Sequence, residues 1–228
     1  MVDILAFGAH PDDIEFACGG ILAKMAAQGK SIVMIDLTIG EKATNGTPEQ
    51  RRLESMKAAA VIGAQREILD FQDCEMMDTY EGRLKFVRVI RKYKPRLIIA
   101  PLWEGTQNHP DHLASGQMAR HACRYARFAK ILPDMPTQTP EGILHYPPNG
   151  YSDRVDFVID ITEHVETWKQ MILYHQSQLK TRDYLEWQMR AAAKYGLFIG
   201  KPYAQGLLKG NPIKVDDLMH IAQGSIEL

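Results

Sequence analysis

Within residues 1–161, short apolar runs rich in β-branched residues alternate with segments of helical periodicity, and this alternation constrains the fold more than any other feature. Strands are expected over 2–9, 31–38, 67–71, 96–101, 142–146 and 155–161, and helices over 14–28, 48–62, 82–93 and 112–128. Strands that alternate with helices are typical of a largely parallel sheet covered by helices on both faces. The sequence therefore predicts an α/β fold of the Rossmann-like, doubly wound type.

The last third of the chain gives a weaker pattern. Helices are expected over 163–179 and 184–195, whereas 199–228 mixes glycine, proline and short apolar stretches and predicts no single element. The proline-rich stretch 132–140 is interpreted as a surface loop and not as a linker between domains. A chain of 228 residues can bury one continuous core. We therefore expect a single domain over 1–228.

Charge and composition exclude several classes of partner. The 27 Lys and Arg residues nearly balance the 28 Asp and Glu residues, so a basic surface for nucleic acid is not expected. The chain contains no apolar stretch of the roughly 18 residues that cross a membrane, and no basic segment precedes its first apolar run. We therefore expect neither nucleic acid nor a membrane as a partner, and we expect a cytoplasmic location.

The three cysteines, Cys18, Cys74 and Cys123, are too few and too scattered for a disulfide framework or a cysteine-based zinc ribbon. Each is interpreted as a small buried apolar residue. Histidines and carboxylates are therefore the candidate ligands for any metal.

Two short polar motifs each follow a predicted strand. The first runs from His10 to Asp13 and the second from His109 to His112, so each carries two potential ligands three residues apart. Because the carboxyl ends of parallel strands meet at one edge of a sheet, both motifs are expected at the same edge. Strand-end loops of this kind can bring together residues that are far apart in sequence.

The residue types in these motifs indicate a catalytic metal site. Two imidazoles and one carboxylate with an open fourth position are typical of catalytic zinc, which lowers the pKa of its bound water to about 7. Asp12, beside the candidate ligand Asp13, is the candidate general base. As an alternative, Asp12 or Asp13 caps the helix that begins at Ile14. His109 or His112 taken alone is more typical of a loop or cap histidine, but the two motifs together favour a metal site.

A nucleotide cofactor is not expected at the first strand-to-helix turn. The glycines there, Gly8, Gly19 and Gly20, do not have the spacing of a dinucleotide-binding motif. The acidic residues of the turn would also repel a pyrophosphate at the start of the helix.

Residues 9–15 (AHPDDIE) and 109–112 (HPDH) resemble the two signatures of the LmbE-like (PIG-L) N-deacetylase family. The resemblance continues through 36–38, 45–47, Arg51 with Glu54, 149–151 and 156–161. It implies one zinc ion per chain, bound by His10, Asp13 and His112. It also implies Asp12 as the general base and later proton donor, and a protonated His109, held by Asp111, that faces the developing oxyanion. A helix cap before His112 is the alternative for Asp111.

Within the family, the chain is most similar to the bacillithiol-pathway enzymes, which act on N-acetylglucosaminyl malate. The resemblance therefore implies a small-molecule amino-sugar substrate, with Arg51 contacting the malate carboxylate. A solvated residue on its helix is the alternative for Arg51. Tyr184 would lie near the reacting carbonyl, although packing in the interior is its alternative. Because relatives are often multimeric, a homo-oligomer is expected.

Two segments depart from the bacillithiol pattern near the expected pocket. The stretch 178–184 is shorter, and Gln107 and Asn108 replace an acidic and basic pair. The alternative function is therefore deacetylation of another N-acyl glycan, such as a chitooligosaccharide or a mycothiol-type precursor. A non-catalytic sugar-binding module is the alternative outside the enzymes.

Overall fold

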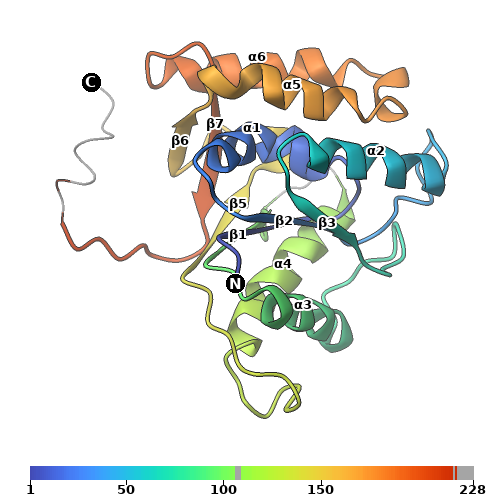
Figure 1. The fold of residues 1–228 in the computed structure, drawn as a ribbon, viewed down its shortest axis with the longest axis vertical. Helices are drawn as coiled ribbons and strands as arrows, with labels where there is room; N and C mark the ends of the chain where they lie inside the picture. The colour runs from blue at the N-terminus through green and yellow to red at the C-terminus, as the bar shows by residue number, and fades with distance from the viewer. Residues whose placement is uncertain (106–108, 218, 220–228) are drawn as a thin grey trace.

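A computed structural model describes residues 1–105, 109–217 and 219. A seven-stranded sheet with the order β3-β2-β1-β4-β5-β7-β6 forms its centre (Figure 1). The strands are β1 (Ile4–Gly8), β2 (Ile32–Asp36), β3 (Gln65–Ile68), β4 (Leu97–Pro101), β5 (Gly142–Tyr146), β6 (Phe157–Asp160) and β7 (Ala204–Lys209). The α-helices are α1 (Asp13–Ala27), α2 (Pro48–Ala60), α3 (Tyr80–Tyr93), α4 (Pro110–Tyr125), α5 (Val165–Leu173) and α6 (Tyr184–Leu197).

The sheet is parallel from β3 to β5, because β1 pairs in parallel with β2 and β4, β2 with β3, and β4 with β5. Helices cover both of its faces, with α3 and α4 on one side and α1 and α2 on the other (Figure 1). The α5 and α6 helices form a further layer over α1 and α2. The predicted α/β, Rossmann-like class is therefore confirmed.

The strand β7 was not expected from the sequence. It lies between β5 and β6 and runs antiparallel to both. Its sequence, AQGLLK, contains two large apolar residues and a central glycine, so it lacks the β-rich signal of the other strands. The glycine, Gly206, is required by close packing: a Cβ atom there would lie 2.8 Å from the ring of Tyr195.

Several boundaries differ from the expected ones for local reasons. The α4 helix begins at Pro110 and not at His112, because proline suits the first helical turn and His109 caps it. The β3 strand covers 65–68 and not 67–71. The α5 helix ends at Leu173 and not at 179, and the chain then turns so that Ser177 donates two hydrogen bonds to Glu54 in α2.

Two buried clusters of side chains form the core, one on each face of the sheet. Trp168 of α5 is fully buried in the first cluster, and its Nε1 donates a hydrogen bond to the carbonyl of Glu15 at 2.7 Å. Phe86 of α3 and Phe7 of β1 are in the second cluster, with ring centroids 4.7 Å apart. Among the described helices, none combines the length and apolar character needed to cross a membrane.

Candidate metal centre

The sheet brings the two His-Pro-Asp motifs together. The turn 9–12 joins β1 to α1, and α4 begins at Pro110, directly after His109 of the second motif. Because β1 and β4 are neighbouring parallel strands, they end at the same edge of the sheet. His10 consequently lies close to both histidines of the second motif: the His10 and His109 rings are 4.7 Å apart, and the His10 and His112 rings 5.4 Å.

The first turn uses its carboxylates for contacts other than helix capping. Asp12 occupies the cap position of α1 but makes no capping hydrogen bond, and its backbone has a φ of 126°. Such a conformation is strained for a residue other than glycine. The side chain of Asp13 folds back and accepts a hydrogen bond from the backbone N–H of His10 at 2.8 Å. The capping alternative therefore does not describe either aspartate.

Three side chains form a compact group of potential metal ligands. The His112 Nε2 atom lies 3.1 Å from Asp13 Oδ1, and the His10 Nδ1 atom lies 3.5 Å from Asp13 Oδ2. One ligand atom from each residue lies within 4.8 Å of the others. Two imidazoles and a carboxylate at this spacing fit a divalent metal ion.

The charges around this group favour a cation. Burial would raise the pKa of Asp13, but the His112 and His10 imidazoles lower that pKa well below its usual range. Burial likewise opposes the charged form of His10, yet its carboxylate neighbours Asp111, Asp13 and Asp73 raise its pKa to about 12. The aspartates therefore stabilise positive charge at the centre of the group, as they would for a bound metal.

Asp12 lies beside the ligand group and has a different environment from Asp13. Burial raises the pKa of Asp12 to about 6, and the Arg51 guanidinium opposes this shift. A carboxylate with this pKa is largely ionised at neutral pH and can accept a proton. The environment thus suits the base that the sequence predicts at this position.

Arg51 is buried and directed at the first motif. Its guanidinium donates hydrogen bonds to the carbonyls of Pro11 at 2.8 Å and Gly40 at 3.1 Å, and lies 3.4 Å from Asp12 Oδ2. Only 3% of its surface is exposed, so the alternative of a solvated helix residue does not apply. Its Nη2 group therefore holds the turn that carries the ligands, and its Nη1 group holds the connection after β2. Its buried Nε has no hydrogen-bond partner among the described residues.

His109 contacts both the backbone and the carboxylate of Asp111. The Nδ1 atom of His109 accepts a hydrogen bond from the backbone N–H of Asp111 at 3.2 Å and lies 4.0 Å from the Asp111 carboxylate. His109, and not Asp111, is therefore the cap of α4. Burial and the neighbouring His10 lower the pKa of His109, so this arrangement favours a neutral imidazole with its proton on Nε2.

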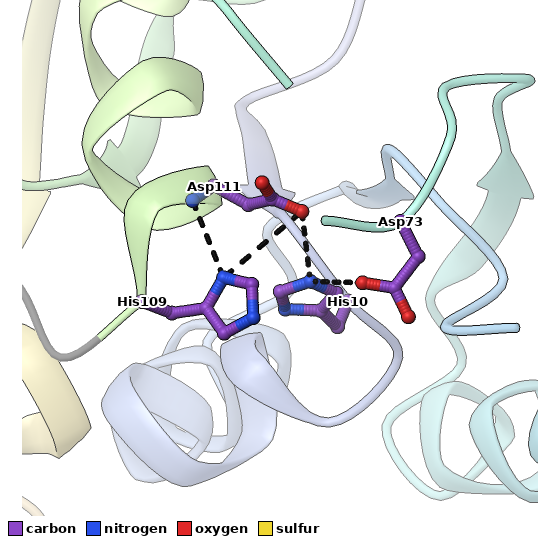
Figure 2. Close-up of side chains that lie close together, drawn as sticks. All are labelled: His10, Asp73, His109 and Asp111. Atoms are coloured by element: carbon purple, nitrogen blue, oxygen red, sulfur yellow. Dashed lines mark hydrogen bonds and ion pairs between the residues drawn. The ribbon is translucent and has the colours of Figure 1, made fainter. Parts of the chain in front are cut away.

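The carboxylate of Asp111 instead joins other parts of the site. It accepts hydrogen bonds from the backbone N–H groups of Cys74 at 2.8 Å and Met76 at 3.3 Å, and lies 3.3 Å from His10 Nε2 (Figure 2). The prediction that every cysteine is buried is wrong for Cys74, which is exposed. Its thiol lies 3.8 Å from His109 Nε2, at the margin of the site.

Sequence reasoning missed Asp73. Its Oδ1 atom lies 3.1 Å from His10 Nε2, and 3% of its surface is exposed. It belongs to no recognised motif, but it follows β3, which ends at the same edge of the sheet as β1. That shared edge is the signal that could have found it.

The remaining predictions concern Tyr184 and two residues that the structure does not describe. Tyr184, at the start of α6, stacks on Phe16 of α1 with ring centroids 5.1 Å apart and an interplanar angle of 20°. This contact supports the packing alternative for Tyr184. The departures at Gln107 and Asn108 fall outside the described residues.

The family follows from a direct comparison with a family model. The model described as "PIG-L: GlcNAc-PI de-N-acetylase" matches residues 5–123, just over half of the chain, and this range contains both motifs. The chain belongs to the PIG-L deacetylase family. It is therefore a metal-dependent hydrolase of the deacetylase type, and the buried His and Asp group occupies the place where the motifs of the PIG-L family converge.

Two relatives extend the similarity beyond the matched range. The diacetylchitobiose deacetylase of Thermococcus kodakarensis is 28% identical over 221 residues, which cover 90% of this chain and 81% of that protein. The crystal structure of the conserved protein TT1542 from Thermus thermophilus is 32% identical, with a TM-score of 0.88 over 94% of this chain and 97% of that one. The family model and the Thermococcus relative are both described as deacetylases, and neither description names a malate glycoside.

The same fold also occurs with another activity. GalB, the 4-carboxy-2-hydroxymuconate hydratase from Pseudomonas putida KT2440, is 22% identical with a TM-score of 0.82, over 96% of this chain and 100% of that one. At this identity the likeness shows the fold alone. The reaction of this PIG-L chain must therefore be argued from its site.

Proposed function

We propose that this protein is a zinc-dependent hydrolase that removes the acetyl group from an N-acetylglucosamine unit of a small conjugate of the chitooligosaccharide type. The observation that carries the proposal is the ligand group of His10, Asp13 and His112 with the buried carboxylate Asp12 beside it. The similarity to diacetylchitobiose deacetylase across 90% of the chain supports this substrate class. A bound zinc ion would polarise the acetamide carbonyl and lower the pKa of a water molecule toward 7.

Asp12 and His109 divide the proton transfers and charge stabilisation between them. The Asp12 carboxylate accepts a proton from the attacking water and later delivers it to the departing amine. The imidazole of His109 donates its Nε2–H to the oxyanion that develops from the acetamide oxygen. Its Nδ1 already accepts the N–H of Asp111, which holds the ring in the tautomer that this role requires.

The contacts of Arg51 count against the malate glycoside as the preferred substrate. A two-point contact with a substrate carboxylate requires two free guanidinium donors. Both Nη groups of Arg51 already donate, to Gly40 and Pro11, and Nε is the guanidinium nitrogen that has no partner among the described residues. A mycothiol-type precursor, the myo-inositol glycoside of N-acetylglucosamine, stays the second candidate substrate. The homo-oligomer and the cytoplasmic location also stay predictions.

The test is amine release by the zinc-loaded protein from four compounds: diacetylchitobiose, the myo-inositol glycoside, the malate glycoside and free N-acetylglucosamine. We expect the highest kcat/KM with diacetylchitobiose, and release slowed about 10²- to 10⁴-fold in an Asp12→Asn variant that still binds one zinc ion. A preference for the malate glycoside would overturn the substrate class. Stoichiometric zinc without turnover of any compound would favour the binding-module alternative.

A further inference from the structure

His10 presents its two ring nitrogens to two different groups of side chains. The Nδ1 atom faces Asp13 at 3.5 Å, on the side where His112 also contacts Asp13. The Nε2 atom faces Asp73 at 3.1 Å and Asp111 at 3.3 Å (Figure 2). The two faces of one imidazole are thus lined by carboxylates from different segments of the site. Each face also has a second imidazole at metal-ligand spacing, His112 beside Asp13 and His109 beside Asp73 and Asp111.

Both carboxylates at Nε2 are held as acceptors. Asp111 accepts the backbone N–H groups of Cys74 and Met76, and Asp73 accepts the backbone N–H of Lys42 at 2.9 Å. Ionised carboxylates can only accept hydrogen bonds, so the nitrogen between them must carry a proton. With the proton on Nε2, the lone pair of a neutral His10 lies on Nδ1.

Asp73 is fixed in place by contacts from outside the ligand group. Its backbone N–H donates to Glu41 Oε1 at 2.7 Å, and its Oδ2 atom accepts from Lys42. Glu41 and Lys42 lie in the connection after β2, whereas Asp73 follows β3. Two strand-end loops thereby hold one carboxylate against the ring of His10, which a mobile surface aspartate could not achieve.

We propose that Asp73, together with Asp111, fixes His10 in the tautomer that presents Nδ1 to a metal bound with Asp13 and His112. This inference rests on the metal site of the proposed function and deepens it. Ligand histidines commonly donate their other ring N–H to a carboxylate, which orients the ring and raises its basicity. Asp73 is then a positioning residue, and the group His10, Asp73, His109 and Asp111 is the support of one metal site and not a second metal site.

The geometry of His109 favours this assignment over a second metal in the same group. His109 could bind a metal through either ring nitrogen, but its Nδ1 lone pair is taken by the N–H of Asp111. The Asp111 oxygens likewise accept backbone N–H groups. A metal at this position would have to displace the cap of α4 and the contacts that hold the 73–76 loop.

The first experiment measures zinc binding without any substrate. Zinc affinity is determined by competition with a chromogenic chelator for the unmodified protein, Asp73→Asn, Asp73→Ala and the control Glu75→Gln. Glu75 lies two residues away and pairs with Lys42 at the surface. We expect the Asp73 variants to lose about 10- to 100-fold in affinity and the control to be unchanged, with one zinc ion per chain. Unchanged affinity in both Asp73 variants, or two ions per chain, would overturn the proposal.

The second experiment reads the proton on His10 directly. In the zinc-loaded protein labelled with ¹⁵N-histidine, we expect His10 to show a metal-bound Nδ1 and a slowly exchanging Nε2–H, with its signals identified by their absence in His10→Gln. In Asp73→Asn the Nε2–H should exchange faster, while the circular dichroism spectrum is unchanged. Metal bound at Nε2 of His10 would contradict the assignment. Neither readout needs turnover, so failure of the proposed deacetylation would be seen separately.

Discussion

The two His-Pro-Asp turns have the same residues at the same spacing, yet their side chains perform different tasks. In the first turn, His10 is itself a member of the ligand group, Asp13 folds back onto the backbone of His10, and the following helix has no side-chain cap. In the second turn, His109 caps the helix, and the carboxylate of Asp111 points to neighbouring loops. The fourth residue, Asp13 or His112, belongs to the ligand group in both.

The difference arises from the backbone at the third residue of the first turn. Asp12 has a φ of 126°, which places its carboxylate beside Arg51 and away from the helix N-terminus. The second turn enters its helix normally, with Pro110 in the first helical turn. A strained backbone is therefore found at the turn that holds the proposed general base, as is common at functional sites.

The largest expected effect distinguishes the loss of a metal ligand from the loss of the general base. His112→Ala removes one of three ligands, so we expect zinc binding and activity to be lost together. Asp12→Asn keeps all three ligands, so we expect one zinc ion per chain and a kcat reduced about 10²- to 10⁴-fold. Zinc content by atomic absorption and kcat on diacetylchitobiose test both variants. Near-normal turnover of Asp12→Asn would show that the first turn does not supply the base.

The second effect concerns the first histidine of the second turn. His109→Asn should reduce kcat by about 10²- to 10³-fold, because the Nε2–H expected to stabilise the oxyanion is lost. Zinc affinity should change little, since His109 lies outside the three-residue ligand group. The matched variant His10→Asn should instead weaken zinc binding. If both variants lose zinc equally, the two turns contribute in the same way and the comparison fails.

Sequence reasoning succeeded where a simple rule connects the position of a residue in the sequence with its position in the fold. Neighbouring parallel strands end at one edge, so the convergence of the His10 and His109 motifs could be predicted. The roles of Arg51 and Asp73 could not, because they depend on how the connections after β2 and β3 pack on the first motif. The sequence also could not show that the Nδ1 atom of His109 accepts a hydrogen bond from the backbone N–H of Asp111. The backbone geometry at the start of α4 decides whether His109 contacts that N–H or the Asp111 carboxylate. The strand β7 was missed because its burial is set by its neighbours and not by its own composition.

The third effect is a shift in the pH dependence. Burial raises the pKa of Asp12 to about 6 and Arg51 opposes that shift. A base must be ionised, so kcat/KM should fall as the pH drops through the pKa of Asp12, at about pH 6 or lower because a bound cation also lowers this pKa. In Arg51→Met the opposing charge is absent, so the acid limb should move to higher pH. In Arg52→Met, which changes the exposed neighbour, the limb should not move. A limb at the same pH in all three proteins would mean that Asp12 is not the titrating base.

The smallest effect tests the capping role that distinguishes the second turn. His109→Ala leaves the backbone N–H of Asp111, in the first turn of α4, without its side-chain acceptor, whereas asparagine is a favourable cap and can replace it. We therefore expect His109→Ala to be less stable than His109→Asn by about 1 kcal/mol, which for a chain of this length lowers Tm by roughly 2–4 °C. Both variants lack the imidazole, so their activities should be similarly low while their stabilities differ. Urea and thermal unfolding in the presence of a chelator exclude a contribution from zinc. Equal midpoints for the two variants would show that the Nδ1 contact contributes nothing to the helix, and the second turn would then resemble the first.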